Sequence, residues 1–141
     1  FRGVSPRRGM MYTALAGPLS NVAIAITLAL TLALTRAAVS LLGGPTDQLH
    51  GGISSIGLQA LIMGIHINLL LATFNMLPIP PLDGSRVLAG LAGREVANLL
   101  DRIEPFGLII LVILINVPAG NVIFNYISLV IGLMEKVLGV R

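Results

Sequence analysis

Cysteine and tryptophan are absent from this sequence, and charged residues make up only 11% of its 141 positions. Without cysteine the chain can form no disulfide bond, no thiolate nucleophile and no cysteine-ligated metal site. Soluble domains carry about 25% charged residues, so this charge content is not typical of a soluble protein. Instead, 55% of the residues are hydrophobic and the mean hydropathy is +0.94, which predicts a membrane protein.

Aromatic residues are also scarce, with four Phe and two Tyr. A net charge of +3 and a pI near 10.2 are compatible with nucleic-acid binding when taken alone. The basic residues, however, are scattered at the ends of apolar runs, which is typical of arginines that flank membrane spans. The sequence therefore predicts the lipid bilayer, and not nucleic acid, as a partner.

Two apolar runs are long enough to cross a membrane. Residues 12–35 carry no charge, and at ~1.5 Å per residue a helix of that length reaches about 36 Å, against ~30 Å for the hydrocarbon core. Residues 53–77 form the second run, after a polar and glycine-rich loop at 43–52. The apolar run at 106–117 is too short to span, and a proline follows it, so residues 106–138 predict a helical hairpin or one interrupted span.

The expected fold class is all-α. We predict a polytopic membrane bundle with two full spans, a proline-broken segment after the second span and a C-terminal helical hairpin. A single domain, residues 1–141, accounts for the length, since no linker or repeat divides the chain. Arginines lie before the first span and after the second, and Lys and Arg accumulate in cytoplasmic loops, so both segments are predicted on the cytoplasmic side.

The segment Asn75–Leu88, NMLPIPPLDGSRVL, places three prolines and an acid at the end of the second span. Each proline lacks an N–H, and a backbone in hydrocarbon needs internal partners, so this segment must be buried in protein or line a wet cavity. An ionised aspartate at membrane depth costs about 2.5–3.5 kcal/mol, so Asp83 is expected at the interface or paired with a cation, a proton or a metal. The alternative is an ordinary turn, with Asp83 as the N-cap of a helix from near Gly84 to Ile103.

The stretch FNMLPIPPLDGSRVL resembles the second signature of the site-2 proteases, which are intramembrane zinc metalloproteases. In that signature an asparagine is followed by a Pro-x-Pro-x-x-Asp-Gly element. ALAGPLSN (Ala14–Asn21) is similar to the Gly-Pro-x-x-Asn element that opens the preceding span in the same family, and RRGM just before it fits the small bacterial members. Both elements occur in the expected order, and the resemblance covers essentially residues 1–141.

The resemblance implies that Asp83 is the third protein ligand of the zinc and that Asn75 lies near the scissile peptide. A catalytic zinc takes three protein ligands and keeps a fourth position for water, whose pKa it lowers to about 7. Pro78 and Pro80 fix the path of the segment that would face an extended substrate, and Asn75 has both a donor and an acceptor for its backbone. For Asn75, capping of the helix C-terminus is the competing interpretation.

Four further residues are implied as supports of the site: Gly17, Pro18, Asn21 and Gly84. The Gly17-Pro18 pair would let the first span kink or let another helix approach closely, and Asn21 could bond across helices. Packing alone explains these residues of the first span as well as function does.

The sequence departs from the family in one respect, because it contains no His-Glu-x-x-His motif. Family members carry that zinc-binding and general-base helix upstream, so the chain is interpreted as the C-terminal part of such an enzyme, with one of three zinc ligands, no catalytic residue of its own and no activity as it stands. His50 lies in the polar loop, and His66 lies in mid-span, where a buried hydrogen-bonding histidine is commoner than a ligand. Glu95, Asp101 and nearby arginines are expected on a solvated face.

The expected function is therefore part of an intramembrane zinc endopeptidase of a bacterial inner membrane, with its site near the cytoplasmic side. Its partners would be transmembrane protein substrates and the N-terminal part of the same protein. A non-catalytic membrane-embedded binding or assembly protein with the same fold is the alternative. A transporter half is a third reading, because broken helices with polar groups near mid-membrane also form substrate sites there.

Overall fold

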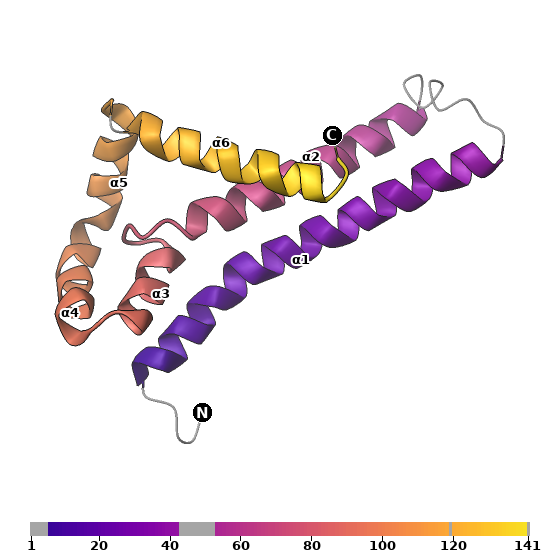
Figure 1. Ribbon diagram of the computed structural model, residues 1–141. Coiled ribbons are helices and arrows are strands. Elements are labelled where there is room, and N and C mark those ends of the chain that lie inside the picture. Colours follow the sequence, from indigo (N-terminus) through magenta and orange to yellow (C-terminus); the bar gives the residue numbers. More distant parts are fainter. Residues whose placement is uncertain (1–5, 43–52, 119, 141) are drawn as a thin grey trace.

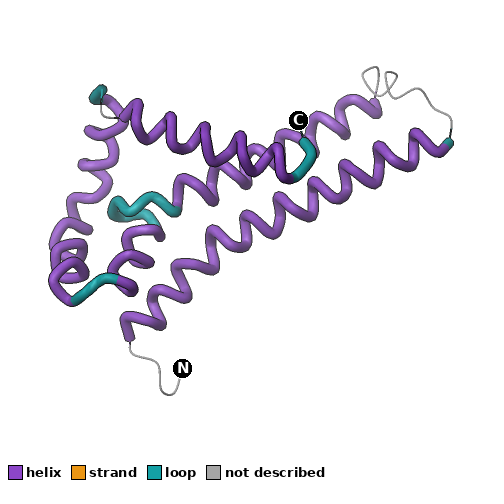
Figure 2. The backbone as a smooth tube through the Cα atoms, viewed as in Figure 1, coloured by secondary structure: helices purple, strands orange, loops and turns teal. Residues whose placement is uncertain are grey.

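The computed structural model describes residues 6–42, 53–118 and 120–140, and within those ranges the chain is helical apart from short turns (Figures 1 and 2). The fold class is thus confirmed as all-α. In chain order the helices are α1 (Pro6–Leu41), α2 (Ile53–Asn75), α3 (Asp83–Leu91), α4 (Arg94–Ile103), α5 (Gly107–Asn116) and α6 (Gly120–Val137), with a 3-10 turn, η2, at Glu104–Phe106.

The two predicted spans are confirmed by α1 and α2. Residues Arg8–Leu41 of α1 and Ile56–Asn75 of α2 are long and apolar enough to cross a bilayer. The α1 helix is longer than the predicted apolar run, because it continues past Arg36 at one end and begins at Pro6 at the other. Pro18 lies inside α1, which remains one helix through it.

The core lies between α1 and α2, which run side by side (Figure 1). Its buried cluster consists of Ala25, Ala29, Leu32, Ile65 and Leu69. Alanines on α1 let the two backbones approach closely, as is typical of helix pairs in membranes. Met134 of α6 and Leu138, which follows that helix, pack against the same cluster from a third direction.

The single helix predicted from Gly84 to Ile103 is wrong, because the structure divides it into α3 and α4. Ala92 and Gly93 are extended, with ψ angles of 165° and 169°. The break lets α3 pack along the N-terminal part of α1 while α4 folds back over α3. The approach of α3 to α1 is close, since a Cβ atom on Gly90 would lie 2.6 Å from Cβ of Met11.

The predicted interruption of the C-terminal apolar region is confirmed. The segments Arg94–Asn116 and Gly120–Val137 meet at 87°, with Val117 and Pro118 between them. A second buried cluster, Leu77, Leu82, Leu111 and Ile127, joins α5 and α6 to the segment between α2 and α3. The C-terminal helices therefore hold the proline-rich segment in place.

Candidate functional site

The proline-rich loop, residues 76–82, connects α2 to α3 and satisfies its own backbone. Its four residues that have an N–H donate to carbonyl oxygens of nearby residues: Met76 to Ala72, Leu77 to Phe74, Ile79 to Leu77 and Leu82 to Ile79, at 2.8–3.2 Å. Leu77, Pro80 and Leu82 are buried. The loop thus satisfies its N–H groups within the protein and is partly buried, as irregular backbone near a membrane requires.

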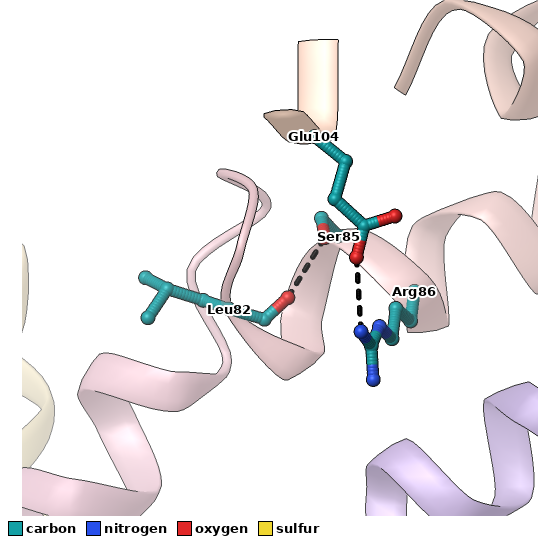
Figure 3. Close-up of polar contacts among 4 residues, drawn as sticks. All are labelled: Leu82, Ser85, Arg86 and Glu104. Atoms are coloured by element: carbon teal, nitrogen blue, oxygen red, sulfur yellow. Dashed lines mark hydrogen bonds and ion pairs between the residues drawn. The ribbon is translucent and has the colours of Figure 1, made fainter. Parts of the chain in front are cut away.

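Asp83 is the first residue of α3, and the N-cap position is Leu82, which makes no side-chain capping bond. The interpretation of Asp83 as an N-cap is therefore wrong for this structure. The backbone turn is instead closed by Ser85, whose hydroxyl donates to the carbonyl of Leu82 at 2.7 Å (Figure 3). The half-buried Asp83 carboxylate is therefore not needed to cap α3. An acid in the first helical turn is also favoured by the helix dipole.

The Asp83 carboxylate lies against Gly17 of α1. A Cβ atom built on Gly17 would lie 3.1 Å from Oδ2 of Asp83, closer than ordinary van der Waals contact. Two residues implied by separate sequence elements are thus brought together, and the missing side chain at Gly17 makes room for the carboxylate. The contact links the first span directly to the end of the proline-rich loop.

Two further glycines make the loop possible. A Cβ atom on Gly84 would overlap the carbonyl groups of Met76 and Leu77, so the position requires glycine. A Cβ atom on Gly107, at the start of α5, would lie 2.6 Å from the carbonyl carbon and oxygen of Pro80. The sequence analysis identified Gly84 and missed Gly107, because nothing local to residue 107 indicates that it faces Pro80.

Asn75 is the last residue of α2 and is half-buried. Its side chain makes no hydrogen bond within the part of the chain that the structure describes. Pro78 is exposed, whereas Pro80 is buried under α5. Asn21 is half-buried on α1 and likewise shows no bond across to α2 among the described residues.

An apolar groove of about 290 Å³ lies beside this region. Three helices contribute to it, and its lining includes Pro18, Leu19, Thr73, Met76, Tyr126 and Val130. The walls come from α1, α2 and α6, and the groove reaches both the residue after Gly17 and the first residue of the loop. The groove therefore lies next to the segments that carry the Gly17–Asp83 contact, although neither of these two residues lines it.

Charged residues gather at the outer side of α3 and α4. Arg86 donates to Oε1 of Glu104 at 2.9 Å, and both side chains are about half exposed (Figure 3). The hydrogen bond to the Glu104 carboxylate raises the pKa of Arg86. Asp101 and Glu95 are exposed, as predicted for a solvated face. Ion pairs of this kind contribute little to stability, typically ~0–1 kcal/mol.

A zinc site requires three protein ligands, and the described residues do not complete one. In the ranges 6–42, 53–118 and 120–140, no three side chains of His, Cys, Asp and Glu come together. His66 is paired with Glu135 of α6, with 2.6 Å between Nε2 and Oε1, which confirms the hydrogen-bonding interpretation of this histidine. His50 lies outside the described residues. Asp83 therefore offers one ligand to a site whose other ligands must come from elsewhere.

Residues 4–117 match the family model of peptidase family M50. The chain is 47% identical over 75 residues to "Putative zinc metalloprotease MJ0611" of Methanocaldococcus jannaschii, covering 53% of this chain and 31% of that protein. It is 32% identical over 117 residues to "Putative zinc metalloprotease YwhC" of Bacillus subtilis, covering 82% of this chain and 50% of that protein. No solved structure matches.

The match thus covers 31% of the length of one relative and 50% of the other. The matched range includes both sequence elements, Ala14–Asn21 and Asn75–Leu88, and the helices that bring Gly17 against Asp83. The chain belongs to peptidase family M50, the site-2 protease family of membrane zinc metalloproteases.

Proposed function

We propose that this chain is the C-terminal part of the membrane core of an intramembrane zinc endopeptidase, and that Asp83 is one of its zinc ligands. The observation that supports this most is the position of the Asp83 carboxylate. It is half-buried and lies against Gly17 of α1, whose chain neighbour Pro18 lines the apolar groove.

Zinc, when bound, would supply a polarised water for peptide hydrolysis. The residues of this chain would hold the metal and orient the substrate. Asp83 presents a carboxylate oxygen, and the tight loop fixes that oxygen because its backbone is bonded internally and clamped by α5. The remaining ligands and the general base come from outside the described residues.

Asn75 is proposed to hold the substrate backbone. Its amide offers one acceptor and two N–H donors. This side chain makes no hydrogen bond to the residues that the structure describes. It ends α2 immediately before Met76, which lines the groove. Pro78 and Pro80 set the course of the chain between Asn75 and Asp83. An unwound segment of a transmembrane substrate, entering from the apolar groove, would reach both side chains.

The site is proposed near the cytoplasmic face of a bacterial inner membrane. The N-terminal end of α1 and the helices α3 and α4 lie at the same end of the molecule (Figure 1), and the sequences of both segments contain arginines. Lys and Arg are enriched in cytoplasmic segments. Residues 1–141 are proposed to form one domain, joined in the enzyme by the part that carries the other ligands.

The alternative is a membrane-embedded binding or assembly protein that retains the fold without catalysis. One observation favours it, namely that no three side chains of His, Cys, Asp and Glu come together among the described residues. The two functions differ in what Asp83 does, so this residue decides between them.

The test is Asp83→Asn in the full-length protein, with zinc content and cleavage of a membrane-bound reporter as readouts. Asparagine keeps the size of the side chain, so the fold is expected to survive. We expect zinc affinity to fall by more than the roughly 10- to 100-fold that follows loss of an outer-shell partner, and cleavage to stop. Asp101→Asn, an exposed acid on α4, is the matched control and should change neither. Full zinc and full activity in Asp83→Asn would end the ligand proposal.

A further inference from the structure

Glu135 is a buried carboxylate at the end of α6, with 1% of its side chain exposed. Gly139, at φ +67°, closes the helix, with N–H groups of Val140 and Gly139 donating to the carbonyls of Glu135 and Lys136. Glu135 therefore belongs to the last turn of α6. Acids are disfavoured there by the helix dipole, and ionisable groups in apolar helix bundles are retained with a partner. A carboxylate in this position needs a specific partner.

His66 of α2 is that partner. Its Nε2 lies 2.6 Å from Oε1 of Glu135, and its Nδ1 lies 2.7 Å from the carbonyl oxygen of Ile62. A carbonyl can only accept a hydrogen bond, so Nδ1 carries a proton. Nε2 is therefore the ring nitrogen that faces the Glu135 carboxylate, at the distance of a close ion pair.

The surroundings of the pair are apolar. Residues 9–35 of α1 contain no Asp, Glu, Lys, Arg or His, and His66 is the single such residue in α2. On α6, Lys136 follows Glu135 and is exposed. The His66 side chain is 41% exposed and the Glu135 side chain only 1%, so the contact with the imidazole matters most for the buried carboxylate.

The pair lies next to the α6 wall of the groove. Met134, which precedes Glu135, packs against the α1–α2 core and also lines the groove together with Val130 and Tyr126. The opposite walls belong to α1 and α2. We infer that His66 and Glu135 are positioning residues, whose close contact seats α6 on α2 and thereby sets the width of the apolar groove near the Gly17–Asp83 contact.

The inference concerns the position of α6 and is independent of proteolysis, so it is tested without a substrate. Thr73 and Val130 line the groove from α2 and α6, and this sequence has no cysteine of its own. Thr73→Cys and Val130→Cys are introduced together into the full-length protein, made cysteine-free elsewhere and reconstituted in liposomes. The rate of cross-linking by a short bifunctional thiol-reactive reagent, a bis-maleimide, then reports how closely α6 sits against α2.

In this background a double-mutant cycle separates the effect of losing the His66–Glu135 contact from the effect of changing the size of the side chains. His66→Phe and Glu135→Leu each leave one polar group without its partner, and each should slow cross-linking by about tenfold. The double variant removes both polar groups. Its cross-linking rate should therefore fall by a smaller factor than the product of the two single-variant factors. Ser128→Ala, an exposed position on α6, is the control and should cross-link at the original rate.

Glu135→Gln keeps a side chain able to donate to Nε2 of His66, and it should cross-link within about twofold of the parent, because a hydrogen bond remains. If His66→Phe or Glu135→Leu fails to fold, Glu135→Gln still tests the inference. Unchanged cross-linking in the folded single variants, multiplicative effects in the double variant, or a Glu135→Gln loss as large as that of Glu135→Leu would each overturn the inference.

Discussion

The contact between Gly17 and Asp83 gives the sharpest test of how the candidate ligand is positioned. In Gly17→Ala the new methyl group would lie 3.1 Å from Oδ2 of Asp83, whereas ordinary contacts begin at 3.4 Å. The carboxylate must therefore move by roughly 0.3 Å. Distances from metal to ligand are held within about ±0.2 Å, so a shift of this size is enough to disturb a zinc site.

The expected effect of Gly17→Ala is a zinc affinity lower by about tenfold, similar to the loss of an outer-shell contact. Gly17→Val adds bulk beyond Cβ and should abolish zinc binding. The stability of Gly17→Ala should rise although its zinc affinity falls, since replacing glycine by alanine inside a helix stabilises it by up to ~1 kcal/mol. A lower metal affinity together with an unchanged or higher Tm is thus the expected result.

The assay is zinc titration of the purified full-length variants against a competing chelator, with Tm measured on the same samples. Gly57→Ala and Gly132→Ala are matched controls in other helices, because nothing lies within 4 Å of a Cβ atom at either position. Both should bind zinc normally. If Gly17→Val binds zinc as tightly as these controls, the Asp83 carboxylate is not held by α1 at a metal, and the reasoning fails.

Three other outcomes are expected. Asn75→Ala should slow cleavage while zinc content stays near normal; loss of zinc would refute a role in holding substrate. Gly84→Ala should destabilise the protein by about 1–3 kcal/mol, seen as a lower Tm, because a methyl group there overlaps two carbonyls, whereas Gly93→Ala, with open space around it, should not. Reporters fused within residues 43–52 and after Arg94 should lie on opposite sides of the membrane, the latter cytoplasmic; a shared side would remove the second span.

Elements defined by composition could be predicted from the sequence. The two spans follow from the length of the apolar runs, and the break before α6 follows from Pro118. The division between α3 and α4 could not be predicted from local pattern, because Gly93 is tolerated inside many helices. Its effect here depends on α3 packing along α1 near Met11, which is a tertiary contact.

The residues of the candidate site could be predicted where they belong to short sequence motifs. Asp83, Asn75 and Gly17 stand out in the sequence, although it does not reveal that Gly17 faces the carboxylate. Gly107 and Glu135 were missed, because their partners lie in distant segments of the chain. An isolated acid in the last apolar run was the available signal for Glu135. Its pairing with a mid-span histidine could have been suggested on the ground that each needs a neutralising partner.

The glycine contacts also determine how this molecule can move. Gly17 and Gly90 bring α1 and α3 into close contact, and Gly107 brings α5 against the loop. Sliding one of these helices by a single residue would advance it ~1.5 Å and turn it by ~100°, which would bring a side chain where a neighbour now sits. We therefore expect α1, the loop, α3 and α5 to move as one rigid body with a fixed axial register. The α6 helix has no close glycine contact at Gly132, and it is held to α2 by the His66–Glu135 contact, so it can move away from the groove only when that contact opens.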